Sequence, residues 1–293
     1  METRRPVVAV IGAGGQLGHA LSAQWADRAD VHRFTHDRLD LCDAAAVASM
    51  VADVRPSVVV NAAAFNDVDG AESRQVDALD INGIGVGVLA RAAASVGATF
   101  VHYSTDFVFA GTVPGVWTET DPPEPQSVYA QSKLMGEWLA AECPWHYVLR
   151  VESLFGGERR RSSIDRIVDT LLRGEPVTLF ADRTVTPSFV DDVAEATWRL
   201  LEAQGPPGLY HCVNAGVTTW YGVGMAVARA CGADEALLRP TSVRHVPMKA
   251  PRPQYAALSA ARLQAVAGAL PEWRDALSRY LRRRGVAGAD ARE

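Results

Sequence analysis

Short runs of apolar residues alternate with segments of helical spacing along the first half of the chain. The first run, from Val7 to Ile11, is apolar at every position, which is typical of a parallel strand buried on both faces. Such alternation predicts an α/β fold with a doubly wound parallel sheet, Rossmann-like in type. The expected strands are 7–11, 30–34, 57–61, 99–103 and 147–150, and the expected helices include 19–25 and 76–96.

Composition and charge exclude several classes of protein. The 293 residues are 48% hydrophobic and 22% charged, with a formal charge of −5, which suits a globular chain with a large core. A mildly acidic balance without long basic runs argues against a nucleic-acid partner. No stretch approaches the ~18 apolar residues of a membrane span. The four cysteines lack metal-binding spacing, so we expect a reducing, cytoplasmic location and no metal.

A glycine-rich segment follows the first expected strand directly and precedes a helical pattern. Its glycines have the spacing GxxGxxG, which permits a tight turn, close approach of a pyrophosphate to backbone N–H groups, and packing of helix on strand. The position between strand and helix favours a dinucleotide-binding turn over a merely structural one. The expected cofactor contacts here are Gly12, Gly14, Gly15, Gln16, Leu17 and Gly18.

Beyond residue 150 the alternation loosens, and connections that contain Gly and Pro become longer. This is consistent with a smaller lobe over the C-terminal edge of the sheet, where ligands bind in such folds. We therefore expect a dinucleotide-binding domain at 1–150. A substrate-binding lobe is expected at 151–293, with parts that return to the sheet.

The end of the second expected strand bears on the choice of cofactor. Chains built for NAD usually place an acid there to bind the ribose 2′-hydroxyl, whereas this chain offers Arg33 and His36 and no acid before Asp37. Cationic groups suit a 2′-phosphate, so NADP(H) is favoured and NAD(H) remains possible. The alternative is that both side chains are simply exposed. Asp40 and Leu41 are expected near the adenine.

Tyr129 and Lys133 are four residues apart, and Lys133 is one of only two lysines beside 27 arginines. On a helix this spacing puts both side chains on one face. An ammonium ~4 Å from the phenol, at an effective dielectric of ~20, would lower its pKa by roughly three units. The pair therefore predicts an acidic tyrosine that serves as a proton donor.

Ser104 and Thr105 follow the fourth expected strand, so they should project over the edge of the sheet where a nicotinamide would lie. Their hydroxyls could donate to a substrate carbonyl while Tyr129 supplies the proton and the cofactor supplies hydride. The alternative is local hydrogen bonding at the end of a strand. The glycine turn and the Tyr129/Lys133 pair favour catalysis.

Together these residues resemble an extended short-chain dehydrogenase/reductase and, more narrowly, the dTDP-4-dehydrorhamnose reductase family. The resemblance covers essentially the whole chain and is densest in the first half. The segments that carry it are 14–18, 61–65, 68–72, 102–109, 129–137, 208–211 and Arg252-Pro253.

The resemblance implies reduction of the 4-keto group of a nucleotide-linked 6-deoxysugar, expected to be a dTDP sugar, by NAD(P)H in deoxysugar biosynthesis. It implies that Thr105 orients the keto oxygen, Tyr129 donates the proton and Lys133 holds the ribose. Family members often carry a Trp in the motif after the fifth strand, where this chain has Ser153 and Leu154. Further implied contacts are Asn61, Ala62, Ala63 and Ala64 with the cofactor, and Ser104, Asp106, Phe107, Ser153, Leu154 and Arg252 with the substrate.

Other functions share parts of this pattern. A related dehydratase has a Glu after its Thr-Asp, where this chain has Phe107, and a nucleotide-sugar 4-epimerase uses the same Thr, Tyr and Lys with NAD. The methionine adenosyltransferase regulatory subunit resembles the same family and binds NADP without catalysis. Some members bind a metal through acidic C-terminal residues at a homodimer contact. Asp290 and Glu293 are too weak a basis to predict such a site here. The presence of Thr105, Tyr129 and Lys133 together favours reduction.

Overall fold

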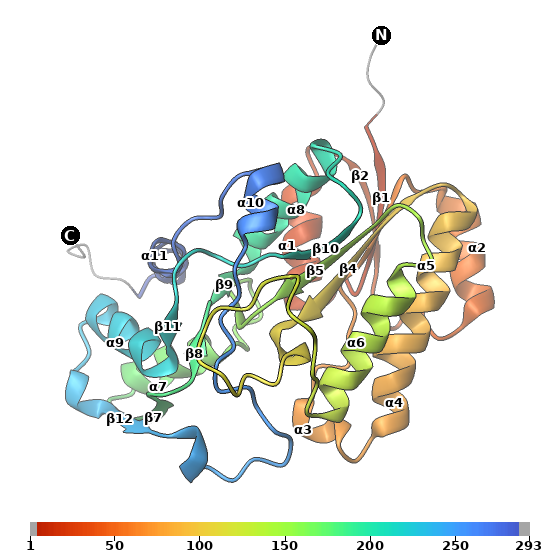
Figure 1. The fold of residues 1–293 in the computed structure, drawn as a ribbon. Coiled ribbons are helices and arrows are strands. Elements are labelled where there is room, and N and C mark those ends of the chain that lie inside the picture. Colours follow the sequence, from red (N-terminus) through yellow and green to blue (C-terminus); the bar gives the residue numbers. More distant parts are fainter. Residues whose placement is uncertain (1–4, 287–293) are drawn as a thin grey trace.

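The structure is a computed structural model and describes residues 5–286. Its centre is a six-stranded sheet in the order β10-β5-β4-β3-β1-β2, and every neighbouring pair in it is parallel (Figure 1). The predicted doubly wound sheet is confirmed. Because the chain moves outward in opposite directions from β1 and β3, the switch point for ligand binding lies between these strands. The strands are β1 (Val7–Ile11), β2 (Asp30–Phe34), β3 (Val58–Asn61), β4 (Thr99–Thr105), β5 (His146–Val151) and β10 (Gly208–His211).

Helices cover both faces of the sheet, which explains the uninterrupted apolar run of β1. Val8 and Val10 belong to the core beneath one helical layer, whereas Ala9 and Ile11 belong to the core beneath the other. One layer contains α1 (Gln16–Trp25), α8 (Val190–Glu202) and α10 (Ala261–Ala267). The other contains α2 (Ala44–Val54), α5 (Gly85–Ser95) and α6 (Val128–Ala140).

The long helix expected over 76–96 is interrupted. The structure has α4 (Gln75–Leu79), a π-helical turn at Asp80–Ile84, and then α5. Asn82 lies in this turn and is fully buried; its side chain accepts from the backbone N–H of Phe65 (2.8 Å) and donates to the carbonyl of Phe65 (3.1 Å) and to Ser132 (3.0 Å). The π turn therefore holds the loop after β3 against α6, and single π turns are often found beside functional sites. The first helix also begins at Gln16, three residues earlier than expected.

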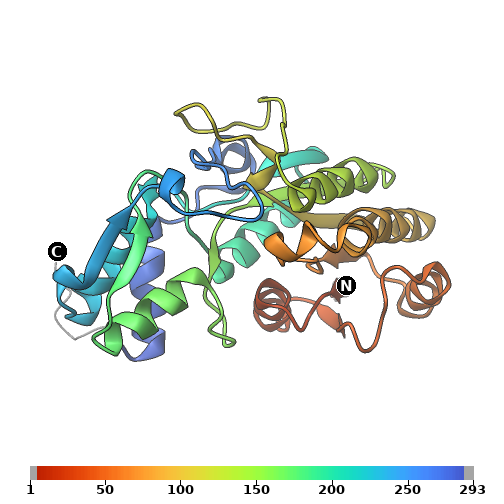
Figure 2. The ribbon, with the colours of Figure 1, turned by 90° about the horizontal axis from the view of Figure 1, so that it is seen from below.

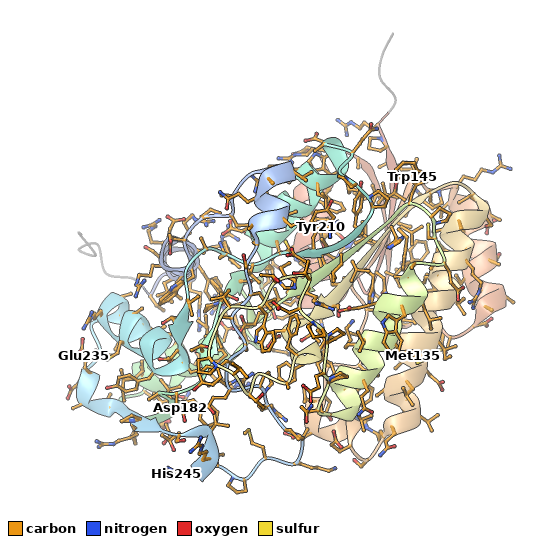
Figure 3. The ribbon with its side chains drawn as sticks, in the orientation of Figure 1. Met135, Trp145, Asp182, Tyr210, Glu235 and His245 are labelled. Atoms are coloured by element: carbon orange, nitrogen blue, oxygen red, sulfur yellow. The ribbon has the colours of Figure 1, made fainter. Side chains whose placement is uncertain are left out.

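The second half of the chain builds a smaller lobe beside the sheet (Figure 2) and also supplies β10, α8 and α10 to the central layers. Asp182, Glu235 and His245 mark this lobe in Figure 3, and Met135 marks α6 across from it. Its elements are α7 (Ser163–Leu172), α9 (Trp220–Cys231), α11 (Trp273–Arg284), β6 (Leu154–Phe155), β7 (Val177–Phe180), β8 (Thr184–Val185), β9 (Ser188–Phe189), β11 (Thr218–Thr219) and β12 (Leu238–Thr241).

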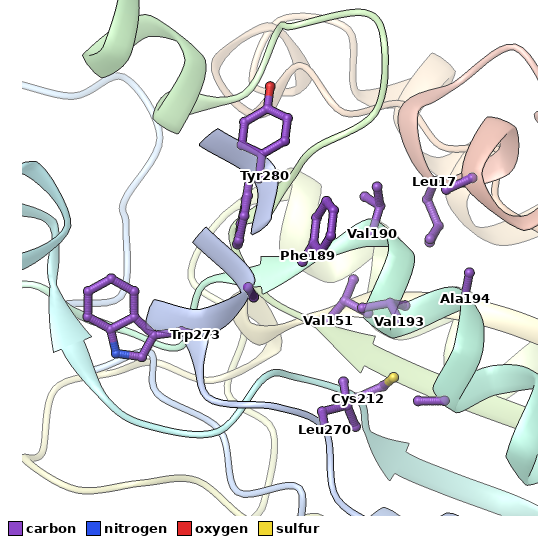
Figure 4. Packing of buried hydrophobic residues seen from close by; sticks show 14 of the residues in the cluster. Leu17, Val151, Phe189, Val190, Val193, Ala194, Cys212, Leu270, Trp273 and Tyr280 are labelled. Carbon is purple, nitrogen blue, oxygen red and sulfur yellow. The ribbon is translucent and has the colours of Figure 1, made fainter. Parts of the chain in front are cut away.

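One hydrophobic core runs from the sheet into this lobe. It includes Leu17 of α1, Val193 of α8, and Trp273 and Tyr280 of α11 (Figure 4). The remaining short elements are α3 (Val68–Ala71) and 3₁₀ turns at Asp106–Val108, Glu235–Leu237 and Val243–His245. Shared burial of this kind couples the lobe to the sheet mechanically.

Within the described part of the chain, no helix combines the length and the apolar character needed to cross a bilayer. Between residues 5 and 286 there is also no group of three or more His, Cys, Asp or Glu side chains that could hold a metal ion. Asp290 and Glu293 lie outside the described residues.

Candidate active site

A cavity of about 630 Å³ at the C-terminal edge of the sheet brings together most of the residues singled out in the sequence. The predicted residues that line it are Gly15, Gln16, Leu17, Ala62, Ala63, Ala64, Ser104, Thr105, Asp106, Phe107, Tyr129, Lys133, Ser153, Leu154 and Arg252. Those that do not line it are Gly12, Gly14, Gly18, Arg33, Asp40, Leu41 and Asn61.

The glycine turn brings α1 and the loop after β3 into close backbone contact. Gly12 has a φ of +79°, and a Cβ there would lie 2.5 Å from the backbone nitrogen of Ala63. A Cβ at Gly18 would lie 2.3 Å from the carbonyl oxygen of Gly12. These two glycines therefore serve backbone packing. Gly15 caps α1 without a side chain, which leaves its N-terminal N–H groups open toward the cavity.

Gln16 supports a dinucleotide fit at this turn. Its side-chain nitrogen is buried and has no hydrogen-bond partner among the described residues, and Gln16 lines the cavity. A donor at a helix N-terminus that also offers free backbone N–H groups suits a phosphate oxygen. The residues present therefore fit the pyrophosphate of NADP.

The end of β2 contributes less than the sequence suggested. Arg33 is exposed on the strand, and the side chain of Asp40 accepts a hydrogen bond from the backbone N–H of Cys42 (2.9 Å). Leu41 is buried in the core beneath α2 and α5. The turn itself is tied to β2 by the N–H groups of Gly12 and Ala13, which both donate to the carbonyl of Phe34 (2.9 and 3.1 Å).

Thr105, Asp106 and Tyr129 lie at the reacting end of the cavity. The hydroxyl of Thr105 donates to Oδ1 of Asp106 (3.0 Å) and accepts from the backbone N–H of Phe107 (3.2 Å). Tyr129, in the first turn of α6, is 8% exposed, and the ring of Phe107 packs edge-on against its ring at 5.6 Å. This places a hydroxyl and a phenol around one volume, as an acid–base site requires.

The expected acidification of Tyr129 by Lys133 is wrong for this structure. Burial and the nearby charge of Asp106 raise the pKa of the Tyr129 phenol well above its ordinary value. The Lys133 ammonium is itself disfavoured, because burial lowers its pKa to about 8. Its Nζ donates to the carbonyl of Tyr103 (2.6 Å) and lies 3.4 Å from Nε2 of His102. Desolvation therefore outweighs the attraction that i,i+4 spacing alone suggested.

A second buried acid lies close to Asp106. Glu152, directly after β5, accepts from the backbone N–H of Thr186 (2.6 Å) and from its hydroxyl. Burial raises the pKa of Asp106 to about 6 and that of Glu152 well above its usual range, and the buried guanidinium of Arg183 partly offsets both shifts. Sequence reasoning missed Glu152 and Arg183, although a polar residue directly after a buried strand is a usable signal.

An ion pair beneath the cavity was also missed. Arg150 of β5 makes two hydrogen bonds to Glu137 of α6 (2.8 and 2.7 Å), and Ser104 donates to the same carboxylate (2.6 Å). Glu137 lies four residues after Lys133, on the same helix face, which was the available signal. Ser104 therefore faces this pair, whereas the Thr105 hydroxyl partly offsets the rise in the pKa of the Tyr129 phenol.

Arg252 reaches the cavity from the far end of the chain. Its guanidinium makes a two-point contact with the carboxylate of Asp69 in α3 (3.0 and 2.8 Å) and donates to the carbonyl of Ala250 (2.7 Å). Its side chain is 15% exposed. A guanidinium oriented in this way can offer its remaining N–H groups to a phosphate.

The parallel sheet, the glycine turn at its switch point and the cavity shared by Thr105, Tyr129 and Lys133 define a Rossmann-like oxidoreductase. The family model "RmlD substrate binding domain" matches residues 6–285. The dTDP-4-dehydrorhamnose reductase of Mycobacterium tuberculosis is 39% identical over 290 residues, which cover 96% of this chain and 94% of the relative. The chain therefore belongs to the dTDP-4-dehydrorhamnose reductase family, and the resemblance in its motifs is confirmed.

Two further comparisons bear on cofactor and sugar. A Bacillus anthracis dTDP-4-dehydrorhamnose reductase structure in complex with NADP superposes with a TM-score of 0.91 at 27% identity, covering 95% of this chain and 99% of that one. A probable dTDP-4,6-dihydroxy-2-methyloxan-3-one 4-ketoreductase of Streptomyces antibioticus is 34% identical, with 92% of each chain covered. Because relatives are named for different sugars, membership of the family does not by itself fix the sugar.

Proposed function

We propose that this protein reduces the 4-keto group of a nucleotide-linked 4-keto-6-deoxysugar, expected to be a dTDP sugar, with NADPH as the favoured coenzyme. The observation that carries the proposal is the single cavity in which the start of α1 meets Thr105, Tyr129 and Lys133. The naming of relatives as dTDP-4-dehydrorhamnose reductases supports the sugar class, and a relative in complex with NADP supports the coenzyme.

NADPH, when bound, supplies the hydride. The Tyr129 phenol, whose raised pKa keeps it protonated at neutral pH, gives its proton to the oxygen that develops negative charge. Thr105 orients that oxygen with its hydroxyl, and Lys133 holds the nicotinamide ribose. Gly15, Gln16, Leu17 and residues 61–64 hold the rest of the coenzyme, and Arg33 remains the proposed partner of the 2′-phosphate.

The substrate is assigned to the other side of the cavity. Asp106 binds a sugar hydroxyl, and the Arg252 guanidinium binds the diphosphate of the nucleotide sugar. Phe107, Ser153 and Leu154 shape the pocket around the sugar. In this proposal residues 1–150 form the dinucleotide-binding domain and residues 151–293 the substrate-binding lobe, and Asp106 and Phe107 of the former also reach the substrate.

The cellular location and the oligomeric state also belong to this proposal. We place the protein in the cytoplasm, in accord with its scattered cysteines. A homodimer is the assembly to test, by light scattering coupled to size-exclusion chromatography.

The direct test is Tyr129→Phe, assayed with NADPH and a panel of nucleotide-linked 4-keto sugars by loss of nicotinamide absorbance. Loss of the proton donor should lower turnover by at least ~10²-fold while NADPH affinity, measured by fluorescence titration, is retained. Tyr147→Phe is the matched control, because its buried hydroxyl bonds the carbonyl of Gly205 far from the cavity. Undiminished turnover in Tyr129→Phe would refute the assigned acid. A purely regulatory binder would consume no NADPH with any sugar.

A further inference from the structure

A buried chain of polar side chains runs from the end of β3 to Lys133. Asn61 ends β3, His102 lies in β4, and Lys133 lies in α6; their exposed fractions are 0%, 0% and 2%. Nδ2 of Asn61 lies 3.2 Å from Nδ1 of His102, and Nε2 of His102 lies 3.4 Å from Nζ of Lys133. Asn61 and His102 are fully buried, so their hydrogens must match the partners that the fold provides.

The backbone decides the orientation of the first group. The N–H of Ala63 donates to Oδ1 of Asn61 (3.0 Å). A flipped amide would point its NH₂ group at that N–H, which is two donors facing each other. Oδ1 therefore faces Ala63, and the NH₂ group of Asn61 faces His102.

The amide in turn decides the histidine tautomer. Nδ1 of His102 must accept the hydrogen from Asn61, so in the neutral ring the single proton is on Nε2. A doubly protonated ring would oppose the amide, and burial together with Lys133 holds the pKa of His102 well below its ordinary value. The Nε2–H bond therefore points at Lys133.

We infer that His102 is a positioning residue that presents its Nε2–H to Lys133 and thereby favours the neutral amine of Lys133 over its ammonium in the free protein. An ammonium has only hydrogens to offer toward Nε2–H, whereas an amine has one lone pair and two hydrogens. The lone pair accepts from His102, one hydrogen goes to the carbonyl of Tyr103 (2.6 Å), and the other is left for the cavity.

Few charged groups lie around Lys133, and the nearest carboxylate already has hydrogen-bond partners. Glu137, one turn on in α6, favours the ammonium, but its carboxylate is bound by Arg150 and Ser104. The wall of the same cavity also carries Asp106, whose raised pKa is about 6, and the guanidinium of Arg183. The relay through His102 therefore adds to burial, which lowers the pKa of Lys133 to about 8.

The consequence for pH dependence has a definite sign. A lowered lysine pKa means that the ammonium is present below about pH 8 and is lost as the pH rises through that value. An ammonium would stabilise the phenolate left on Tyr129 after proton transfer, so turnover should fall above about pH 8. Removal of the Nε2–H should move that fall to higher pH.

The test uses the scarcity of lysine. In Lys249→Arg, which replaces an exposed lysine outside the cavity, ¹³C-labelled lysine reports Lys133 alone. We expect its ε-carbon to titrate near pH 8, against ~10.4 for a free lysine. ¹⁵N shifts of the His102 ring should show the proton on Nε2.

His102→Gln in the same background is the perturbation. Its distal amide replaces Nε2 but can turn its oxygen toward Nζ, so the midpoint should rise by at least one pH unit, a tenfold change in the proton affinity. The alkaline limb of kcat/KM should move with it. A merely structural role would lower stability or rate without moving either midpoint.

Three results would overturn the inference: a wild-type midpoint near 10, a His102 ring protonated on Nδ1, or an unchanged midpoint in a folded His102→Gln variant. If the variant does not fold, the His102 tautomer and the Lys133 midpoint of the wild type still test the inference. These spectra come from the free protein, so they remain informative even if the proposed reductase reaction fails.

Discussion

Replacement of Glu137 with Gln removes one charge from the ion pair beneath the cavity and leaves the shape of the side chain. The carboxylate receives three hydrogen bonds, two from Arg150 and one from Ser104. The side chains of Arg150 and Glu137 are 2% and 7% exposed. In the variant a single amide oxygen must serve these donors, and the amide NH₂ group would face a guanidinium N–H.

The expected cost follows from the uncompensated charge that remains on Arg150. Removal of one partner from a buried ion pair costs about 3–5 kcal/mol. An unfolding entropy of about 2.1 cal/mol/K per residue gives about 0.6 kcal/mol/K for a chain of this size. We therefore expect Tm to fall by about 5–8 °C, with reductase activity reduced because Ser104 and α6 lose a shared anchor.

Calorimetry and urea unfolding would measure this loss. The control is Glu142→Gln, which breaks the Arg91–Glu142 pair, whose side chains are 56% and 36% exposed. Such an exposed pair contributes ~0–1 kcal/mol. If Glu137→Gln loses no more stability than this control, burial does not govern the pair and the reasoning is refuted.

Three other changes test separate parts of the site. Asp106 has a folded pKa of about 6, above its unfolded value, so its contribution to stability is lost as the pH rises from the unfolded pKa to the folded one. The Asp106→Asn variant should therefore be more stable than the wild type by up to ~3 kcal/mol at pH 7.5, and by almost nothing at pH 4. A pH-independent difference in urea unfolding would contradict this. Arg252→Lys loses the two-point contact with Asp69, so KM for the nucleotide sugar should rise ~10-fold or more with NADPH affinity unchanged; equal effects on both ligands would count against a diphosphate role. Gly18→Ala forces a Cβ against the carbonyl of Gly12 and should cost ~1–3 kcal/mol and weaken NADPH binding; an undisturbed Tm would show that the turn can yield.

Much of the fold could be predicted from the local pattern of apolar residues and glycines. The apolar run of β1 predicts a strand with helices on both faces, and its residues do divide between two cores. The spacing of Tyr129 and Lys133 predicts a shared helix face, and both line one cavity from α6. Glycine spacing predicts close backbone approach, because only glycine lacks the Cβ that would collide at Gly12 and Gly18.

Long-range packing decided what the pattern could not. The partners of a buried group come from distant segments: Asp69 meets Arg252 across 183 residues, and Arg183 approaches Asp106 from the smaller lobe. The sequence alone therefore identified the chemical groups of the site, but not their protonation states. Those depend on how much water the fold removes and which charges it brings near, and here desolvation raises the pKa of Tyr129 and lowers that of Lys133.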